Sequence, residues 1–160
     1  MKALILYYSR SGKTRNIAEI IGEKLVAEVE EIFDHKSRKG LLGFIASGNE
    51  AYLQRFIPID KIEKDLSQYD VVVVGTPIWA GNMSTPILSF FREYKEKIPR
   101  IAFFTTSIGS DPQKVFLTVE HITAQKLVTV MNFTNHDIKK RYHLDMIDEF
   151  INRIKQALKD

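Results

Sequence analysis

The sequence contains no cysteine, and this absence excludes several classes of chemistry. Without a thiol there can be no disulfide, no thiolate nucleophile, no iron–sulfur cluster and no zinc–thiolate centre. Any redox chemistry therefore requires a bound cofactor. The four histidines, at positions 35, 121, 136 and 143, show none of the paired spacings of metal ligands, so we expect no metal site.

Long apolar runs and a strong charge of one sign are also absent. No stretch approaches the roughly 20 apolar residues that a membrane-spanning helix needs, and the N-terminal apolar run leads into Arg10 and Lys13 instead of a signal cleavage site. We therefore expect a cytoplasmic protein with no membrane span. The 23 Lys and Arg nearly balance the 20 Asp and Glu, for a net charge of +3. Because no nucleic-acid-binding signature accompanies the short basic runs, we expect no nucleic-acid partner.

What the sequence does contain is a regular alternation of apolar strands and amphipathic helices. Short apolar runs predict strands at residues 2–8, 29–33, 71–74, 101–106 and 127–133. Helical periodicity predicts helices at residues 16–26, 86–97, 113–123 and 144–158. This alternation predicts an α/β fold in which helices cover both faces of a parallel sheet, a doubly wound arrangement of three layers. At 160 residues, 1–160 is expected to be one domain.

Ligands of such sheets bind at the carboxyl ends of the strands, so the loops that follow the strands were compared. The first of these loops, SRSGKT at residues 9–14, ends like a nucleoside-triphosphate loop, but Tyr7 stands where that motif requires its first glycine. Its hydroxyls and backbone N–H groups at the start of a helix instead suit a phosphate monoester. The alternative is that Ser11 or Gly12 merely caps the helix.

The loop after the third predicted strand carries the only tryptophan of the chain, Trp79. Pro77 restrains Thr76 to an extended conformation, and Gly81 permits a backbone conformation that a side chain would disfavour. A lone tryptophan usually belongs to the core or to a partner contact. Its position at the ligand end of the sheet favours a platform for a ligand.

Together, SRSGKT (9–14), TPIWAGN (76–82) and TSIGSD (106–111) give the whole chain a resemblance to the flavodoxins and flavodoxin-like flavoproteins. The resemblance implies a five-stranded sheet of order 2-1-3-4-5, in the shorter form of the family, with FMN as the cofactor. It also implies electron transfer through the bound flavin to a redox partner protein or a small-molecule acceptor. Because the flavin performs the chemistry, no catalytic residue is implied.

The resemblance also implies which part of the cofactor each loop contacts. The first loop is implied to hold the phosphate, the second to flank the ribityl chain, the ring and the edge that bears N5, and the third to offer backbone groups to the pyrimidine edge. In that order the residues are Ser9, Arg10, Ser11, Gly12, Lys13 and Thr14; Thr76, Pro77, Ile78, Trp79, Ala80, Gly81 and Asn82; and Ser107, Ile108 and Gly109.

Three functions stay open on the sequence. They are an electron carrier, an FMN-dependent reductase or dehydrogenase, and a non-redox module that binds a phosphate ligand. The enzyme would act on a small substrate of quinone or protoporphyrinogen type, with NAD(P)H as a possible donor. Two features favour it slightly: no tyrosine occurs in the 106–111 loop, and the apolar segment 36–57 is unusually long. That segment is either a crossover helix that covers the sheet or a lid or docking element beside the flavin.

Overall fold

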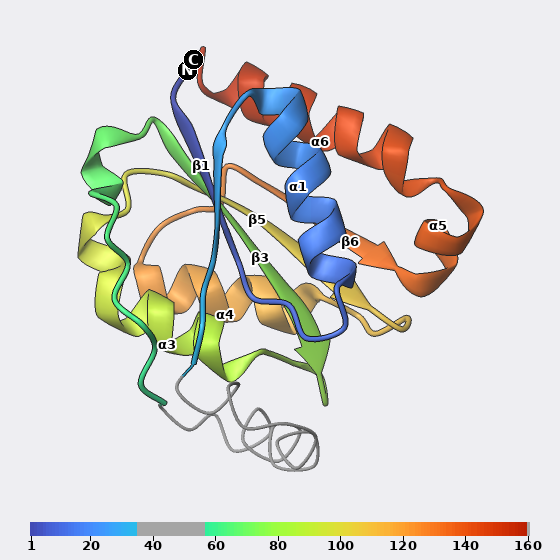
Figure 1. Cartoon of the computed structure of the whole chain (residues 1–160), viewed down its shortest axis with the longest axis horizontal. Coiled ribbons are helices and arrows are strands. Elements are labelled where there is room, and N and C mark those ends of the chain that lie inside the picture. The colour runs from blue at the N-terminus through green and yellow to red at the C-terminus, as the bar shows by residue number, and fades with distance from the viewer. Residues whose placement is uncertain (35–56, 160) are drawn as a thin grey trace.

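The computed structural model describes residues 1–34 and 57–159, and it contains a parallel sheet between two layers of helices (Figure 1). The parallel strands are β1 (Ala3–Tyr7), β2 (Glu28–Glu31), β3 (Val71–Trp79), β5 (Ile101–Ser107) and β6 (Thr129–Thr134). Their order is β2-β1-β3-β5-β6, which confirms the predicted 2-1-3-4-5 order and the doubly wound fold. A sixth strand was not predicted: β4 (Asn82–Met83) pairs antiparallel with the end of β3.

Helices cover both faces of the sheet (Figure 1). One face carries α1 (Lys13–Leu25) and α6 (His143–Ala157), and the other carries α3 (Thr85–Tyr94) and α4 (Gln113–Thr123). Shorter elements are α5 (Asn135–Lys140) and the 3₁₀ turns η2 (Leu66–Gln68) and η3 (Lys95–Lys97). Helix α1 begins at Lys13, three residues before the predicted start at residue 16. The prediction was too late because the first turn of the helix is polar and lacks the apolar periodicity.

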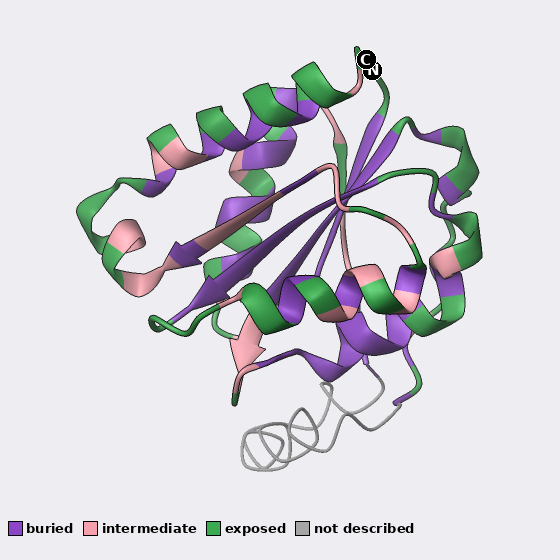
Figure 2. Ribbon diagram, turned by 180° about the vertical axis from the view of Figure 1, so that it is seen from behind, coloured by how far each residue is buried: buried purple, intermediate pink, exposed green. Residues whose placement is uncertain are grey.

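The core divides into two clusters because successive strand residues point to opposite faces of the sheet. From β1, Leu4 and Leu6 pack into the cluster below α3 and α4, whereas Ile5 packs into the cluster below α1 and α6. On β5, the neighbouring Phe103 and Phe104 divide between the clusters in the same way. Burial on both faces explains why these strands form continuous apolar runs (Figure 2). The two buried clusters are almost entirely apolar, and the hydroxyl-rich loops lie at the ends of the strands.

The segment 36–57 lies, except for Ile57, outside the described residues, so both interpretations of that segment stay predictions. Within residues 1–34 and 57–159, no helix combines the length and the apolar character needed to cross a membrane.

Candidate functional site

Side-chain contacts join the three predicted loops at the carboxyl end of the sheet. The hydroxyl of Thr14, from the first loop, lies 2.9 Å from the hydroxyl of Thr106, at the start of the third. The ring of Tyr8, the residue just before the first loop, lies 5.6 Å from the ring of Trp79 of the second loop in an edge-to-face arrangement. The second and third loops follow neighbouring strands, in which Pro77 is the register partner of Thr106. Residues far apart in sequence therefore surround one region.

The first loop has the features of a phosphate site. Gly12 precedes α1 with a φ of 84°, in the left-handed region that favours glycine. Within the described part of the chain, no side chain caps the start of α1, so its first N–H groups are not satisfied in that way. The Oγ atom of Ser9 is buried and has no hydrogen-bond partner among the described residues. A phosphate that accepts from Ser9 and from the start of α1 would satisfy both sets of donors.

The remaining residues of the first loop differ in exposure and in whether their side chains already have hydrogen-bond partners. Ser11 is exposed, and Lys13 is exposed with its Nζ donating to Oδ1 of Asn135 at 2.8 Å. Thr14 is 2% exposed, and its hydroxyl is paired with that of Thr106. In this pair one hydroxyl donates its proton and the other accepts it. The accepting hydroxyl keeps its own proton, which it can donate to a further acceptor.

Below this loop, Tyr7 links α1 to the edge strand β2. The Arg15 guanidinium donates to Oε2 of Glu31 at 2.5 Å and to the Tyr7 hydroxyl at 3.3 Å. Burial raises the pKa of the Tyr7 hydroxyl, and the hydrogen bond from Arg15 opposes that rise. The sequence analysis did not identify this group, because its three members come from separate elements. It anchors the first turn of α1, which carries Lys13 and Thr14.

The second loop is a two-residue hairpin between β3 and β4, which the sequence analysis missed. Its central residues, Ala80 and Gly81, have φ values of 47° and 74°, as a type I′ turn requires. Trp79 and Asn82 are partners across the hairpin, and the Asn82 side-chain amide donates to the carbonyl of Ala80 at 3.1 Å. Gly81 therefore adopts a positive φ, the kind of conformation that was predicted for it. Ala80 also adopts a positive φ, which costs an alanine about 1–2 kcal/mol. The hairpin presents Trp79, half-buried, at the end of β3.

Thr76 and Ser84 close the base of this hairpin. The N–H of Ser84 donates to Oγ1 of Thr76 at 3.0 Å, and their hydroxyls lie 2.9 Å apart. Thr76 is fully buried, so its hydroxyl supports the loop, while Pro77 and Ile78 are half-buried. At the start of α3, Oγ1 of Thr85 is buried without a hydrogen-bond partner in the described part of the chain. Threonine before proline is typical of an N-cap, but here Ser84 is the N-cap and Thr85 is the first residue of α3.

In the third loop, Ser107 follows Thr106 and is the last residue of β5. Ser107 is 6% exposed, and its Oγ is another buried hydroxyl for which the described residues provide no partner. The following Ile108 is 87% exposed, and Gly109 adopts a φ of 149°. Ser9 and Ser107 therefore bring two unpartnered hydroxyls to the carboxyl ends of β1 and β5. Buried hydroxyls without a protein partner are uncommon in folded proteins and are satisfied by an ordered water or by a ligand.

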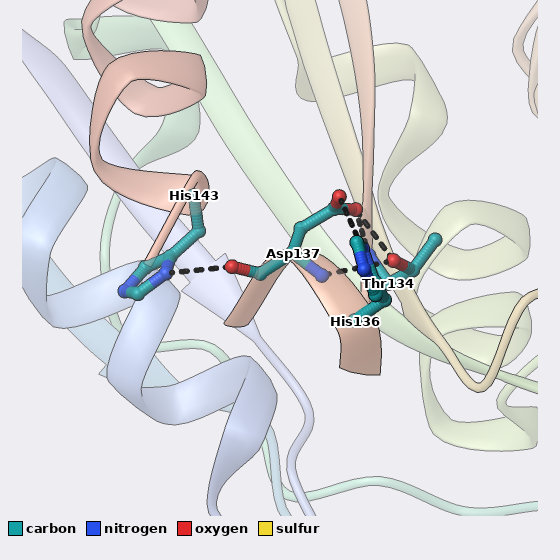
Figure 3. A network of polar contacts seen from close by, with 4 residues as sticks. All are labelled: Thr134, His136, Asp137 and His143. Atoms are coloured by element: carbon teal, nitrogen blue, oxygen red, sulfur yellow. Dashed lines mark hydrogen bonds and ion pairs between the residues drawn. The ribbon is translucent and has the colours of Figure 1, made fainter. Parts of the chain in front are cut away.

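A polar network at the end of β6 includes Thr134, His136, Asp137 and His143 (Figure 3). Thr134 and Asp137 form a capping box at the start of α5: the N–H of Thr134 donates to Oδ2 of Asp137 at 2.8 Å, and the N–H of Asp137 donates to the Thr134 hydroxyl at 3.2 Å. Burial raises the pKa of Asp137, but the hydrogen bonds from Thr134 and the neighbouring His136 together outweigh burial, and the pKa lies below its ordinary value. Asn135, the first residue of α5, is thereby fixed where it accepts from Lys13.

Comparison with known proteins supports a flavodoxin-like assignment. No protein-family model matches the sequence. A curated NAD(P)H dehydrogenase (quinone) from Cupriavidus metallidurans is 29% identical over 89 residues, which are 56% of this chain and 44% of that protein. The chain thus spans less than half the length of the curated relatives it matches.

Solved structures match over nearly the whole chain. A flavoprotein from Lactobacillus acidophilus NCFM, in complex with FMN, superposes with a TM-score of 0.73 at 25% identity, over 87% of this chain and 97% of that one. A flavodoxin from the domain Archaea superposes with a TM-score of 0.58 at 18% identity, over 98% and 99% of the two chains. Strand order, loop placement and these neighbours confirm the resemblance seen in the three loop motifs: the chain is a flavodoxin-like α/β protein.

Proposed function

We propose that the protein binds FMN at the carboxyl ends of β1, β3 and β5 and transfers electrons through the bound flavin. The observation that carries the proposal is the buried, unpartnered hydroxyl of Ser9 beside the start of α1, which no described side chain caps. A dianionic phosphate satisfies such donors and is favoured by the positive end of the helix dipole. The similar protein from L. acidophilus was crystallised with FMN, which has one terminal phosphate.

In this proposal each loop has a separate task. The first loop binds the phosphate with Ser9, Ser11, Thr14 and the backbone that follows Gly12. The hairpin places Trp79 against the ring, and Ser107 with the backbone of the third loop binds the pyrimidine edge. Bound FMN supplies the one- and two-electron chemistry, while the protein sets its orientation and its access to solvent.

The test identifies the cofactor directly. The purified protein should show a flavin spectrum in the visible region, or should acquire one when the apoprotein is mixed with micromolar FMN. The flavin released by heat should run as FMN on chromatography. The first loop has donors for a single phosphate, and the sequence shows no second motif that would bind the adenosine half of FAD. Released FAD, or no flavin uptake at all, would contradict the proposal.

A second candidate is an FMN-dependent reductase with a small substrate of quinone type. The observation that favours it is the name of the curated relatives, NAD(P)H dehydrogenase (quinone). Oxidation of NADH or NADPH by the FMN-loaded protein, accelerated by an added quinone, would favour this candidate. Reduction only by a partner protein or a chemical reductant would favour the carrier. One domain over residues 1–160 and a cytoplasmic location stay predictions from the sequence.

A further inference from the structure

Two residues that flank Ser9 hold the indole of Trp79. The ring of Tyr8 meets the indole edge-to-face, with ring centres 5.6 Å apart and planes at 88°. The guanidinium carbon of Arg10 lies over the indole, 5.7 Å from the ring centre. This distance is within the range of a cation–π contact, and tryptophan is the best of the aromatic side chains for that contact. The residue predicted to face the ring is therefore tied to the loop predicted to hold the phosphate.

The shape of the guanidinium allows it to serve both ends of the cofactor. Its five N–H donors lie in the plane of the group, whereas stacking uses its faces. Arg10 can thus rest on the indole and donate within its plane to a phosphate oxygen at the same time. A lysine ammonium at this position would keep the positive charge, but it has no plane and would not be oriented by the indole in the same way.

We propose that Trp79 is a positioning residue for phosphate recognition: the indole orients the Arg10 guanidinium toward the phosphate of the cofactor, in addition to facing the ring. This inference rests on the proposed function, that is, on FMN binding at the three loops. It has a consequence that a ring contact alone would not produce. The preference of the apoprotein for FMN over riboflavin, which differ only in the phosphate, should depend on Trp79.

The test measures the dissociation constants of FMN and riboflavin for the apoprotein and follows their ratio. In Trp79→Leu the preference for FMN should fall by about two- to fivefold, the amount expected for loss of a cation–π contact at a partly exposed site. Trp79→Phe keeps an aromatic face and should retain most of the preference. In an Arg10→Lys background, Trp79→Leu should produce a smaller fall, because the planar group that the indole orients is already absent.

Lys13→Met is the matched control. Lys13 belongs to the same loop and carries the same charge, but it contacts Asn135 and not the indole. Its effect on the ratio should therefore add to that of Trp79→Leu, whereas the effect of Arg10→Lys should not. If Trp79→Leu fails to fold, Trp79→Met, which also removes the aromatic face, is compared in the wild-type and Arg10→Lys backgrounds.

Two outcomes would overturn the inference while leaving FMN binding intact. One is an equal loss of affinity for FMN and riboflavin in Trp79→Leu, which would limit the indole to the ring. The other is an effect of the Trp79 substitution on the ratio that persists undiminished in the Arg10→Lys background. Failure of the proposed function itself would look different, because the wild-type apoprotein would then bind neither flavin.

Discussion

Replacing Ser9 by alanine should change the stability of the apoprotein and its affinity for FMN in opposite directions. The Oγ atom of Ser9 is buried and has no hydrogen-bond partner among the described residues. We expect such a hydroxyl to oppose folding of the empty protein, because no described protein group replaces the hydrogen bonds that it makes to water in the unfolded chain. The same hydroxyl should favour binding once a phosphate oxygen accepts from it. A residue that only supported the fold would show neither pattern.

The expected magnitudes follow from this environment. An unsatisfied buried polar group costs about 1–3 kcal/mol, and the low end applies because the residue as a whole is only half-buried. The Ser9→Ala apoprotein should therefore be more stable by about 1 kcal/mol, or by about 3 °C in Tm for a chain of this size. Loss of a hydrogen bond to a charged group costs about 1.5–3 kcal/mol, so FMN should bind about 10- to 150-fold more weakly.

Thermal unfolding of the apoprotein and fluorescence titration with FMN and riboflavin measure the two effects. Ser11→Ala is the control, since Ser11 is exposed and its loss should leave the apoprotein stability within about 0.5 kcal/mol. Riboflavin affinity should not change in Ser9→Ala. A destabilised Ser9→Ala apoprotein, or an unchanged FMN affinity, would refute the reasoning and assign Ser9 to the fold.

Three further predictions follow from other parts of the site. Ala80→Gly should stabilise the protein by about 0.5–1 kcal/mol, seen as a higher Tm, because relief of the left-handed strain exceeds the added flexibility of glycine; a lower Tm would contradict the strained turn. Lys13→Glu should make the reduction potential of the FMN-loaded protein more negative, by an amount that shrinks as salt is added; a shift insensitive to salt would exclude a Coulombic origin. Asp137→Asn should destabilise the protein by about 0.3–1 kcal/mol at neutral pH. Because folding lowers the pKa of Asp137, its contribution to the free energy of unfolding is present above about pH 4 and is lost as the pH falls through the folded pKa. The free energies of unfolding in urea of the wild type and Asp137→Asn should therefore converge in acid.

The fold followed from the sequence because its determinants are local and repeated. A strand buried on both faces, such as Val71–Val74 in β3, needs an apolar residue at every position, and this pattern is visible without knowledge of its neighbours. A helix of a covered sheet shows one apolar face, as α6 does with Ile147, Phe150 and Ile154. The order of the strands came from the resemblance of the loops, since periodicity does not state which strands are neighbours.

The local structure of the loops was harder to predict from the sequence. Ala80 gave no indication of a type I′ hairpin, because alanine is uncommon at positive φ and the usual signal is asparagine or aspartate before glycine. The start of α1 was placed too late because a polar first turn carries no hydrophobic periodicity. At Ala80 the surrounding structure outweighed the preference of the individual residue.

The sequence by itself determined which segments are buried, that they alternate as strands and helices, and that hydroxyl- and glycine-rich loops follow three of the strands. Only the tertiary structure decided the state of each hydroxyl. Thr14 is paired with Thr106, 92 positions away, whereas Ser9 has no partner among the described residues. Similarly, Lys13 donates to Asn135, 122 positions away. Neighbouring residues in one loop thus differ because hydrogen bonding depends on which distant strand ends meet, and this is set by packing of the whole sheet and not by local pattern.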